Sequence, residues 1–467
     1  MTEIALERRE SWWELVRAAL AGTHQDYTSG PIARSLLLLA IPMVLETAME
    51  SVFAVVDVFF VSRLGADAVA TVGLTESMLV MVYTVAIGLS IGLSAVVARR
   101  IGEKDGPGAA RAAVQGVALG LGVAAAVGAI GIVFAPQLLA LMGASPAVQA
   151  AGAGYTRVML AGSGTVLLLF LINAVFRGAG DATIAMRSLW LANGINIVLD
   201  PCLIFGLGPF PEMGLTGAAV ATTIGRGTGV LYQLTQLCRR DGRVLIRRAH
   251  LRLDPEAMAT VVRLSGVATF QVLIATTSYI GLVRVVSSFG SEVLAGYTIA
   301  IRLLMFVLLP SWGLSNAAAT MVGQALGAEK PERAARAVGL AGIYNVVLLG
   351  LVSVVFLVFA RGIVSAFSTD PPVLAEGVLA LRTIAVGLAF YGYGMVLHQS
   401  FNGAGDTWTP TYLNLLCFWA LQIPLAWVLS RRVGAWGAYL AMPLAECTLT
   451  VLSAWMFGRG RWKTRRV

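Results

Sequence analysis

The chain has 467 residues, of which 57% are apolar and only 13% are charged, and its mean hydropathy is +0.79. These values exclude an ordinary soluble domain, in which about 25% of residues are charged. The formal net charge of +9 does not identify a partner by itself, because the positions of the basic residues decide what they bind.

The first predicted element is an amphipathic helix over Leu6–Leu20, within an N-terminal segment at 1–35 that we expect in the cytoplasm. Trp12 and Trp13 would lie at headgroup depth if this helix rests on the inner leaflet. A soluble N-terminal helix explains the same pattern nearly as well. The segment lacks an apolar core, so no cleavable signal peptide is expected.

Twelve apolar segments follow, each long enough to supply the roughly 20 residues that a helix needs to cross the hydrocarbon core. Alternating strand patterns are absent from the sequence, so we expect helices rather than a barrel. The predicted fold class is an all-α integral membrane protein with twelve transmembrane helices. The predicted spans cover about 37–62, 68–98, 112–135, 152–176, 185–207, 216–238, 262–288, 294–322, 338–360, 373–400, 410–430 and 435–457.

Basic residues are concentrated in alternate connecting segments. With the N-terminus in the cytoplasm, 25 of the 34 lie on the cytoplasmic side and only 4 lie outside. This asymmetry follows the positive-inside rule. It predicts a multi-pass protein of the plasma (inner) membrane with both termini in the cytoplasm, and it explains the charge without nucleic acid. The cytoplasmic segments are the stretch before the first span, 99–111, 177–187, 239–263, 330–336 and the tail after 457.

The two halves of the chain repeat each other. FRGAGD at Phe176–Asp181 recurs as FNGAGD at Phe401–Asp406, and other matched residues share the same offset. Each half holds six predicted spans, so both copies face the same way and a pseudo-two-fold axis runs along the membrane normal. The basic linker between the halves is expected to be attracted to anionic lipids. The predicted units are an N-lobe at 36–238, a cytoplasmic linker at 239–261, a C-lobe at 262–457 and a basic cytoplasmic tail at 458–467.

Polar residues mark where the two copies differ. Asp57 aligns with Leu282, and Asp200 aligns with Ile423 when the copies are aligned on their shared proline. The N-terminal half therefore has acidic and amide side chains at positions where the C-terminal half has bulky side chains without these groups. We place the ion-coupled site in the N-lobe for this reason. The same contrast holds for Asn173 and His398, for Asn196 and Trp419, and for Thr222 and Met442.

Two predicted spans carry polar stripes. At about 100° per residue, Asn193, Asn196 and Asp200 form one stripe on the fifth span. Carboxylates inside a membrane are costly and face the bundle interior, so they are functional candidates. Burial and neighbouring like charge disfavour the ionised form, which suits a group that must bind and release a proton. Structural hydrogen bonding is the alternative role for each of them. The second stripe, on the first span, consists of Glu46, Glu50 and Asp57.

Other charged residues lie within spans. Arg226, Arg284 and Arg302 are candidate counter-ions to Glu46, Glu50 or Glu76, but no spacing selects a pair. Glu446 on the last span is a further candidate for a cavity.

Pro42 lies one helical turn before Glu46 and removes a backbone hydrogen bond from the first span. Such a helix can have two bends of similar energy. We therefore hypothesise that Pro42 is a hinge, and that protonating Asp57 and Asp200 changes which bend is preferred and closes the adjacent pocket on its cargo.

Five motifs carry a family resemblance: VVDVFFVSRLG, FRGAGD, NIVLDP, GLTGAAVAT and FNGAGDTWTP. Together they resemble the multidrug and toxic compound extrusion (MATE) family over about residues 35–457, and the acidic pair confined to the N-terminal half resembles its DinF-like branch. The resemblance implies a V-shaped pair of six-helix lobes. It also implies that the lobes alternate between inward and outward openings and export amphipathic organic cations in exchange for H⁺ or Na⁺.

By motif, the residues that match the N-lobe cation site of that branch are Asp57, Asn173, Asn196, Asp200 and Thr222. The seventh span carries no carboxylate and has Arg284 instead. This departure from the sodium-coupled pattern favours protons, or Na⁺ at Asp57 and Asp200, and no other metal site is expected.

The expected partners are small amphipathic molecules and anionic membrane lipids, with no nucleic acid. We expect a monomer that needs no cofactor beyond the coupling ion. A lipid-linked precursor flippase of the same superfamily is the alternative, because arginines within the spans can hold phosphate. A membrane-embedded lipid enzyme is disfavoured, since its only candidate motif, His250–Asp254, lies in the basic linker.

Overall fold

The computed structural model describes residues 11–22, 25–239 and 242–465, and these residues form helices and connecting turns with no strand among them. The helices are α1 (Trp12–Ala21), α2 (Ile32–Val61), α3 (Ala66–Gly102), α4 (Gly106–Leu141), α5 (Pro146–Ala161), α6 (Ser163–Ala179), α7 (Ala182–Phe205), α8 (Leu215–Leu237), α9 (Pro255–Ser287), α10 (Ser291–Gly327), α11 (Pro331–Ser365), α12 (Pro371–Ala385), α13 (Leu388–Gly403), α14 (Trp408–Asn414), α15 (Ile423–Val433) and α16 (Ala435–Gly458). A π-helical segment, η3 (Leu415–Gln422), joins α14 to α15, and short helical turns lie at η1 (Ser62–Leu64), η2 (Arg248–His250) and η4 (Arg461–Thr464).

Most of these helices are long and apolar enough to span a membrane. Among the described residues, 10 continuous helical segments meet that description, and α12 with α13, bent by 53° at their junction, makes an eleventh. The remaining long helix is α8, which is rich in threonine and glycine and contains Arg226. The predicted all-α membrane fold with a twelve-helix, two-lobe arrangement is confirmed.

Several helices extend beyond the predicted spans because polar residues cap them. α9 begins at Pro255, where the Asp254 side chain accepts hydrogen bonds from the first backbone N–H groups. Residues 255–261, assigned to the linker from the sequence, are therefore helical. α1 begins after Ser11, which forms a capping box with Glu14. It starts later than the predicted amphipathic helix, part of which lies outside the described residues.

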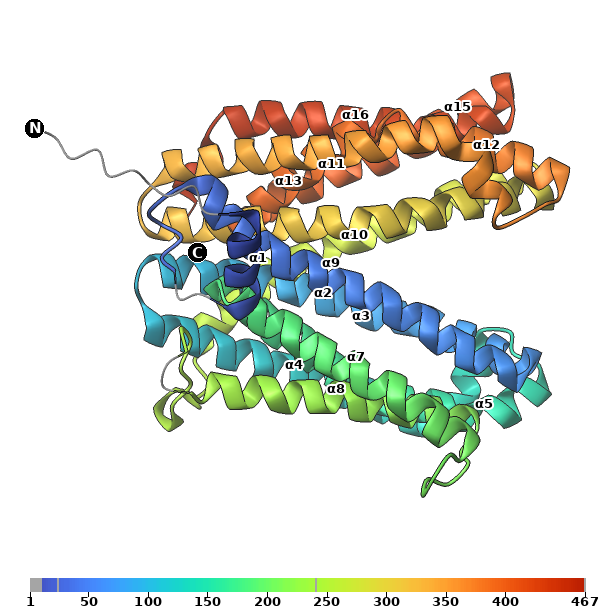
Figure 1. The fold of residues 1–467 in the computed structure, drawn as a ribbon, viewed down its shortest axis with the longest axis horizontal. Helices are drawn as coiled ribbons and strands as arrows, with labels where there is room; N and C mark the ends of the chain where they lie inside the picture. The colour runs from blue at the N-terminus through green and yellow to red at the C-terminus, as the bar shows by residue number, and fades with distance from the viewer. Residues whose placement is uncertain (1–10, 23–24, 240–241, 466–467) are drawn as a thin grey trace, which may run out of the picture.

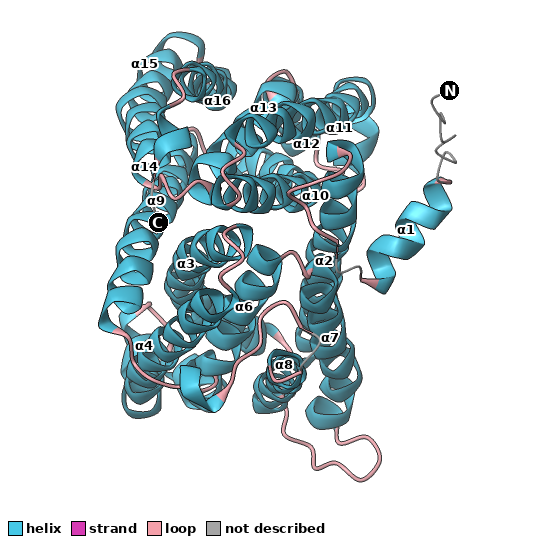
Figure 2. Cartoon of the chain, turned by 90° about the vertical axis from the view of Figure 1, so that its left-hand side faces the viewer, coloured by secondary structure: helices cyan, strands magenta, loops and turns pink. Residues whose placement is uncertain are grey.

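The helices form two bundles that meet at one end. In Figure 1, the helices of the two halves run close together on the left, where α1 and the end of α16 lie, and they diverge toward the right. We call the left-hand end the terminal face and the right-hand end the opposite face. Viewed onto the terminal face, α9 and α2 lie at the two ends of the boundary between the bundles, on the left and on the right of Figure 2.

α2 and α9 each pass from one bundle to the other. The first half of α2, including Leu36 and Leu39, packs in a core cluster with residues of α10 and α11. Val261 of α9 packs with N-terminal-half helices, whereas Leu282 packs with α10 and α16. The division between the lobes therefore runs through these two helices, which the sequence had assigned whole to one lobe each.

Glycines at equivalent positions of the two halves allow α3 and α10 to pack closely at the terminal face. A Cβ atom on Gly102 of α3 would lie 2.1 Å from the carbonyl oxygen of Gln324, and one on Gly327 of α10 would lie 2.2 Å from that of Arg99. The backbones of α3 and α10 can touch there only because both positions lack a side chain. The Gln324 amide also donates to the carbonyl oxygen of Gly178 at 2.9 Å. The two halves of the repeat are thus locked together at this face.

Candidate functional site

The centre of the N-lobe contains a buried ion pair. Glu46 lies near the middle of α2 and is 5% exposed. Its Oε1 accepts from the Arg177 guanidinium at 2.7 Å and from the Asn173 amide at 3.0 Å. This ion pair joins α2 to α6, and the sequence analysis had placed Arg177 in a cytoplasmic connection.

Asn173 connects this ion pair to two further helices. Its Oδ1 accepts from Ser188 Oγ at 3.0 Å and from the Gln233 amide. Gln233 also donates to Ser188 Oγ at 3.0 Å. Both side chains are fully buried, so the network fixes α6, α7 and α8 around the Glu46 carboxylate.

Asn173 is therefore remote from Asp200, although the sequence assigned both to one cation site. Asn173 lies in the last third of α6, close to where that helix reaches the terminal face at Ala179. Asp200 lies in the last turns of α7, which starts at the terminal face at Ala182 and runs away from it. Counted along the two helices, the side chains differ in depth by roughly 18 Å at about 1.5 Å per residue.

A second ion pair lies one turn farther along α2. Arg226 of α8 is 4% exposed, and its Nη2 lies 3.6 Å from Glu50 Oε1. Its Nη1 donates to the Tyr83 hydroxyl at 2.9 Å, and its guanidinium lies over the ring of Phe53. The Asn193 amide donates to the other oxygen of Glu50 at 3.3 Å. Arg226 is thus the counter-ion of Glu50, a pairing that the sequence left open.

Asp200 has only neutral hydrogen-bond partners among the described residues. It is fully buried, and Asn196 bridges it to Thr222. With the amide oriented to satisfy both groups, the Asn196 nitrogen donates to Asp200 Oδ2 at 3.0 Å, and its oxygen accepts from Thr222 Oγ1 at 3.1 Å and Thr222 N at 2.9 Å. The neighbouring Thr223 hydroxyl instead bonds to the Ala219 carbonyl of its own helix. Three of the five predicted cation-site residues are therefore in direct contact.

Asp57 is close enough for its charge to act on Asp200, and Glu76 and Arg226 in turn act on Asp57. It is partly exposed and lies about one turn before the end of α2 at Val61. Asp200 is similarly near the end of α7 at Phe205. The pair therefore lies toward the opposite face, whereas the sequence analysis expected a position deeper in the membrane.

Pro42 stands where α2 changes partners. A Cβ atom on Gly313 of α10 would lie 2.8 Å from the backbone nitrogen of Val44, and the Thr47 hydroxyl is 3.2 Å from the carbonyl oxygen of Leu309. From Glu46 onward α2 also bonds to the N-lobe, through the carboxylates of Glu46 and Glu50. Pro42 thus lies within the part of α2 that packs on the C-lobe, about one turn before Glu46, the first carboxylate that bonds to the N-lobe.

The remaining charged candidates lie outside this site. Glu446 is 8% exposed and belongs to the C-lobe, on α16. Arg284 and Arg302 are exposed, and neither forms an ion pair within the described part of the chain. Of the three arginines proposed as counter-ions, Arg226 alone forms an ion pair within the described residues.

The geometry divides the N-lobe carboxylates into two classes. Glu46 and Glu50 are already neutralised by arginines, so binding an external cation there requires an ion pair to break. Asp200 has free acceptor capacity beside a second carboxylate, Asp57. Carboxylate, amide and hydroxyl oxygens can hold either a proton or a hard cation such as Na⁺. Asp57 and Asp200 therefore keep acceptor capacity that Glu46 and Glu50 use in their ion pairs.

The protein-family model described as MatE matches the chain twice, at residues 42–202 and 268–428. The two matches follow the internal repeat, one in each half. Together they cover more than half of the chain.

Curated relatives and a solved structure are similar over nearly the whole chain. A Bacillus subtilis protein described as "Probable multidrug resistance protein YoeA" is 26% identical over 95% of this chain and 97% of its own length. A Shewanella oneidensis protein described as "FAD transporter" is 27% identical over 91% of this chain and 94% of its own. A structure described as the outward-facing conformation of a multidrug resistance MATE family transporter of the MOP superfamily has a TM-score of 0.85 and 26% identity, covering 93% of this chain and 97% of that one.

Proposed function

The chain belongs to the MatE family of multidrug and toxic compound extrusion transporters, and on this premise we propose that it exports amphipathic cations in exchange for protons. The cargo would be drugs or metabolites, and Asp57 and Asp200 would bind the coupling ion. Na⁺ at the same carboxylates is the alternative coupling ion. The acidic N-lobe site also supports assignment to the DinF-like branch.

The orientation we propose puts the terminal face in the cytoplasm of a cell bounded by the plasma (inner) membrane. Basic residues from separate segments gather there: Arg243 lies 3.3 Å from Asp181, and Arg465 lies 3.3 Å from Asp406. Lys330 donates to the carbonyl oxygen of Thr28. This concentration of positive charge on one side agrees with the positive-inside rule.

The observation that carries the proposal is that, among the residues the structure describes, no cationic side chain bonds to Asp200. A fully buried carboxylate whose hydrogen-bond partner is a neutral amide is unfavourable when charged, and the like charge of Asp57 adds to this. One proton taken up between the two carboxylates removes the repulsion. No arginine has to be displaced, in contrast to Glu46 and Glu50.

We connect this protonation to movement through α2. The first half of the helix packs on the C-lobe as far as Thr47, about one turn beyond Pro42, and Asp57 lies in the second half, whose carboxylates bond to the N-lobe. Neutralising Asp57 and Asp200 changes the interactions of only that part, so a change of bend at Pro42 alters how the lobes meet. Alternating access then follows from two bends of one helix.

Cationic cargo is favoured by the carboxylates that remain accessible in the N-lobe. Glu76 is exposed on α3, and Asp57 is partly exposed near the end of α2. Relatives described as multidrug resistance proteins support the same cargo class. A lipid-linked precursor flippase is not favoured, because Arg226, the buried arginine of the N-lobe spans, is already engaged by Glu50 and Tyr83.

The proposal is tested by drug resistance in cells that express a double variant, Asp57→Asn with Asp200→Asn. We expect resistance to cationic drugs to be lost while the amount of protein in the membrane is unchanged. The matched control is Asp67→Asn, which changes an exposed aspartate in the first turn of α3 and should keep full resistance. Full resistance in the double variant would reject the proposed coupling site.

A further inference from the structure

Two carboxyl groups are buried among the described residues of the C-lobe: Asp406, which pairs with Arg465 at the terminal face, and Glu446. Glu446 lies at the middle of α16, and it is 8% exposed. Within the described part of the chain, no arginine, lysine, amide or hydroxyl group bonds to it. It differs in this respect from Glu46 and Glu50 of the N-lobe, which have arginine partners.

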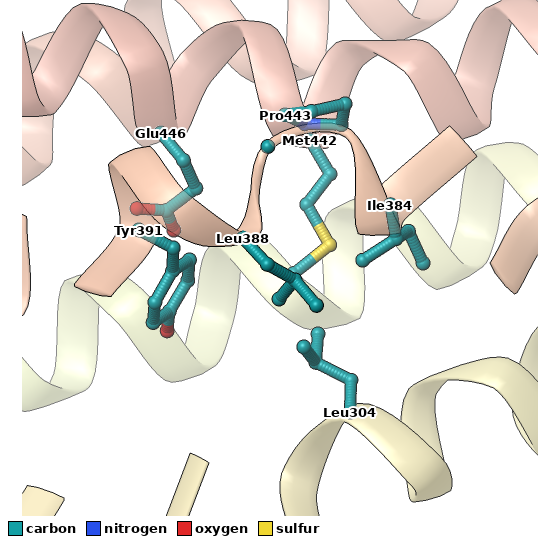
Figure 3. Close-up of a pocket in the computed structure, with 8 residues that line it drawn as sticks. Leu304, Ile384, Leu388, Tyr391, Met442, Pro443 and Glu446 are labelled. Atoms are coloured by element: carbon teal, nitrogen blue, oxygen red, sulfur yellow. The ribbon is translucent and has the colours of Figure 1, made fainter. Parts of the chain in front are cut away.

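Glu446 borders a small cavity of about 10 Å³, the order of space that one water molecule occupies. Figure 3 shows its side chain beside that of Tyr391, with Leu388, Met442 and Ile384 along the rest of the wall. This lining is apolar apart from Glu446 and Tyr391. An ionised carboxylate would be left without solvation or a partner here, so the neutral acid is the stable form in this conformation.

Three irregularities in the helices lie close to Glu446. Pro443 lies within α16, less than one turn before Glu446. A Cβ atom on Gly387, at the 53° bend between α12 and α13, would lie 2.7 Å from the Pro443 side chain. The π-helical segment η3 packs against α16 from another side. Prolines, glycine breaks and π segments are the places where helices change their bend, and π segments frequently mark functional sites.

The titratable groups around Glu446 are few. Tyr391 of α13 and Cys417 of η3 are near enough to sense its charge, as is Cys447 on α16 itself. Glu376 of α12 bonds to Tyr439, two turns from Glu446 toward the opposite face. The other groups on packed helices lie farther along them or are directed elsewhere: His398 is two turns from Tyr391 toward the terminal face, and Arg431 and Arg432 end α15. Arg382 of α12 is exposed and donates to the carbonyl oxygen of Leu357 on α11. A proton on Glu446 is therefore not competing with a nearby cation.

We propose that Glu446 is a second proton-binding group of the transporter, protonated in the conformation described here and deprotonated when the bends at Gly387 and Pro443 change and water reaches its cavity. It would give the C-lobe its own proton-dependent switch, beyond the coupling through Asp57 and Asp200. The inference rests on the alternation of conformations in the proposed function. It does not rest on the N-lobe carboxylates.

The first test is infrared spectroscopy of the purified full-length protein in lipid nanodiscs. Wild type should show the carbonyl band of a neutral carboxylic acid at neutral pH, and Glu446→Gln should lack that band. Glu446→Asp should keep a shifted band, which separates loss of the acid from misfolding. The control Glu376→Gln removes another C-lobe carboxyl group and should retain the wild-type band. Identical bands in wild type and Glu446→Gln would overturn the proposal.

The second test counts protons released when a cationic dye that the protein exports is added to the same preparations. Glu446→Gln should release fewer protons than wild type, by up to about one per molecule. The comparison is repeated in an Asp200→Asn background, so that failure of the N-lobe coupling site is seen separately from failure of Glu446. Equal release with and without Glu446 in both backgrounds would mean that the acid is only structural.

Discussion

Arg226 of α8 lies 3.6 Å from Glu50 of α2, across the interior of the N-lobe. Tyr83 and Phe53 complete the surroundings of the guanidinium group. The consequence is an acidic lobe in which Glu46 and Glu50 are paired, while Asp57 and Asp200, nearer the opposite face, have no arginine bonded to them in the described part of the chain.

Replacing Glu50 with Gln should destabilise the protein, because it leaves the Arg226 charge buried without its partner. Breaking a fully buried pair costs about 3–5 kcal/mol, and the partial exposure of Glu50 reduces this to about 1–3 kcal/mol. Adding Arg226→Met to Glu50→Gln should recover most of the loss. Thermal unfolding in detergent measures both changes. A double variant as unstable as the single one would mean that the pair is not the source of the effect.

Replacing Pro42 with Ala should slow export several-fold while leaving expression and insertion intact. The alanine restores the backbone hydrogen bond that the proline removes, so one bend of α2 becomes favoured over the other. Initial rates of dye efflux measure the effect. The control is Pro136→Ala, which changes a proline inside α4, away from the boundary between the lobes. Unchanged efflux in Pro42→Ala would remove the hinge from the mechanism.

Arg333 of α11 binds residues 25–30 of the N-terminal segment at the terminal face. The Arg333 guanidinium donates to the carbonyl oxygens of Tyr27, Ser29 and Gly30 at 3.0, 2.7 and 2.7 Å. Opening of this face requires these hydrogen bonds to break or the segment to move with α11. Arg333→Ala should therefore favour opening there.

Opening is measured from the distance between spin labels on α3 and α10 at the terminal face. In Arg333→Ala the population with the longer distance should increase. The matched control is Arg336→Ala, since Arg336 is exposed and bonds only within its own helix. Equal distance distributions in Arg333→Ala and wild type would show that the segment does not hold the face closed.

The same segment should loosen in acid. Burial opposes ionisation of Asp26, but hydrogen bonds from Thr28 and Ser29 and the charge of Lys330 together lower the pKa of its carboxyl group below the usual value. A lowered pKa in the folded state means that the stabilisation is present at neutral pH and is lost as the pH falls below about 4. Hydrogen exchange at residues 25–30 should show this loss in wild type and not in Asp26→Asn. A pH dependence that persists in Asp26→Asn would assign it to another group.

Local features of the site could be predicted from the sequence, and contacts between distant segments could not. Asn196 and Asp200 are one helical turn apart on α7, so helical geometry alone brings them together. The pairs Glu50–Arg226 and Glu46–Arg177 instead join helices that are far apart in the sequence. Periodicity gives no information about which helix faces which. Arg177 follows Asn173 by one helical turn, and that spacing was the available signal for its role.

The same distinction between local features and contacts of distant segments applies to the fold. The repeat and the hydropathy pattern are properties of single segments, and they predicted twelve helices in two related halves. The passage of α2 and α9 between the bundles depends on close backbone contacts, such as that of Gly313 with Val44. Those contacts arise only after the helices have packed, so the sequence alone assigned each helix to one lobe.

The most direct test of the central claim is drug flux in proteoliposomes with pH and Na⁺ gradients imposed separately, using wild type and Asp200→Asn. We expect the pH gradient to drive flux in wild type and the Na⁺ gradient to leave it unchanged. Asp200→Asn should still bind the drug but show no flux driven by the pH gradient. Flux in Asp200→Asn equal to that of wild type under the pH gradient would contradict the claim that this buried carboxyl group couples proton movement to export.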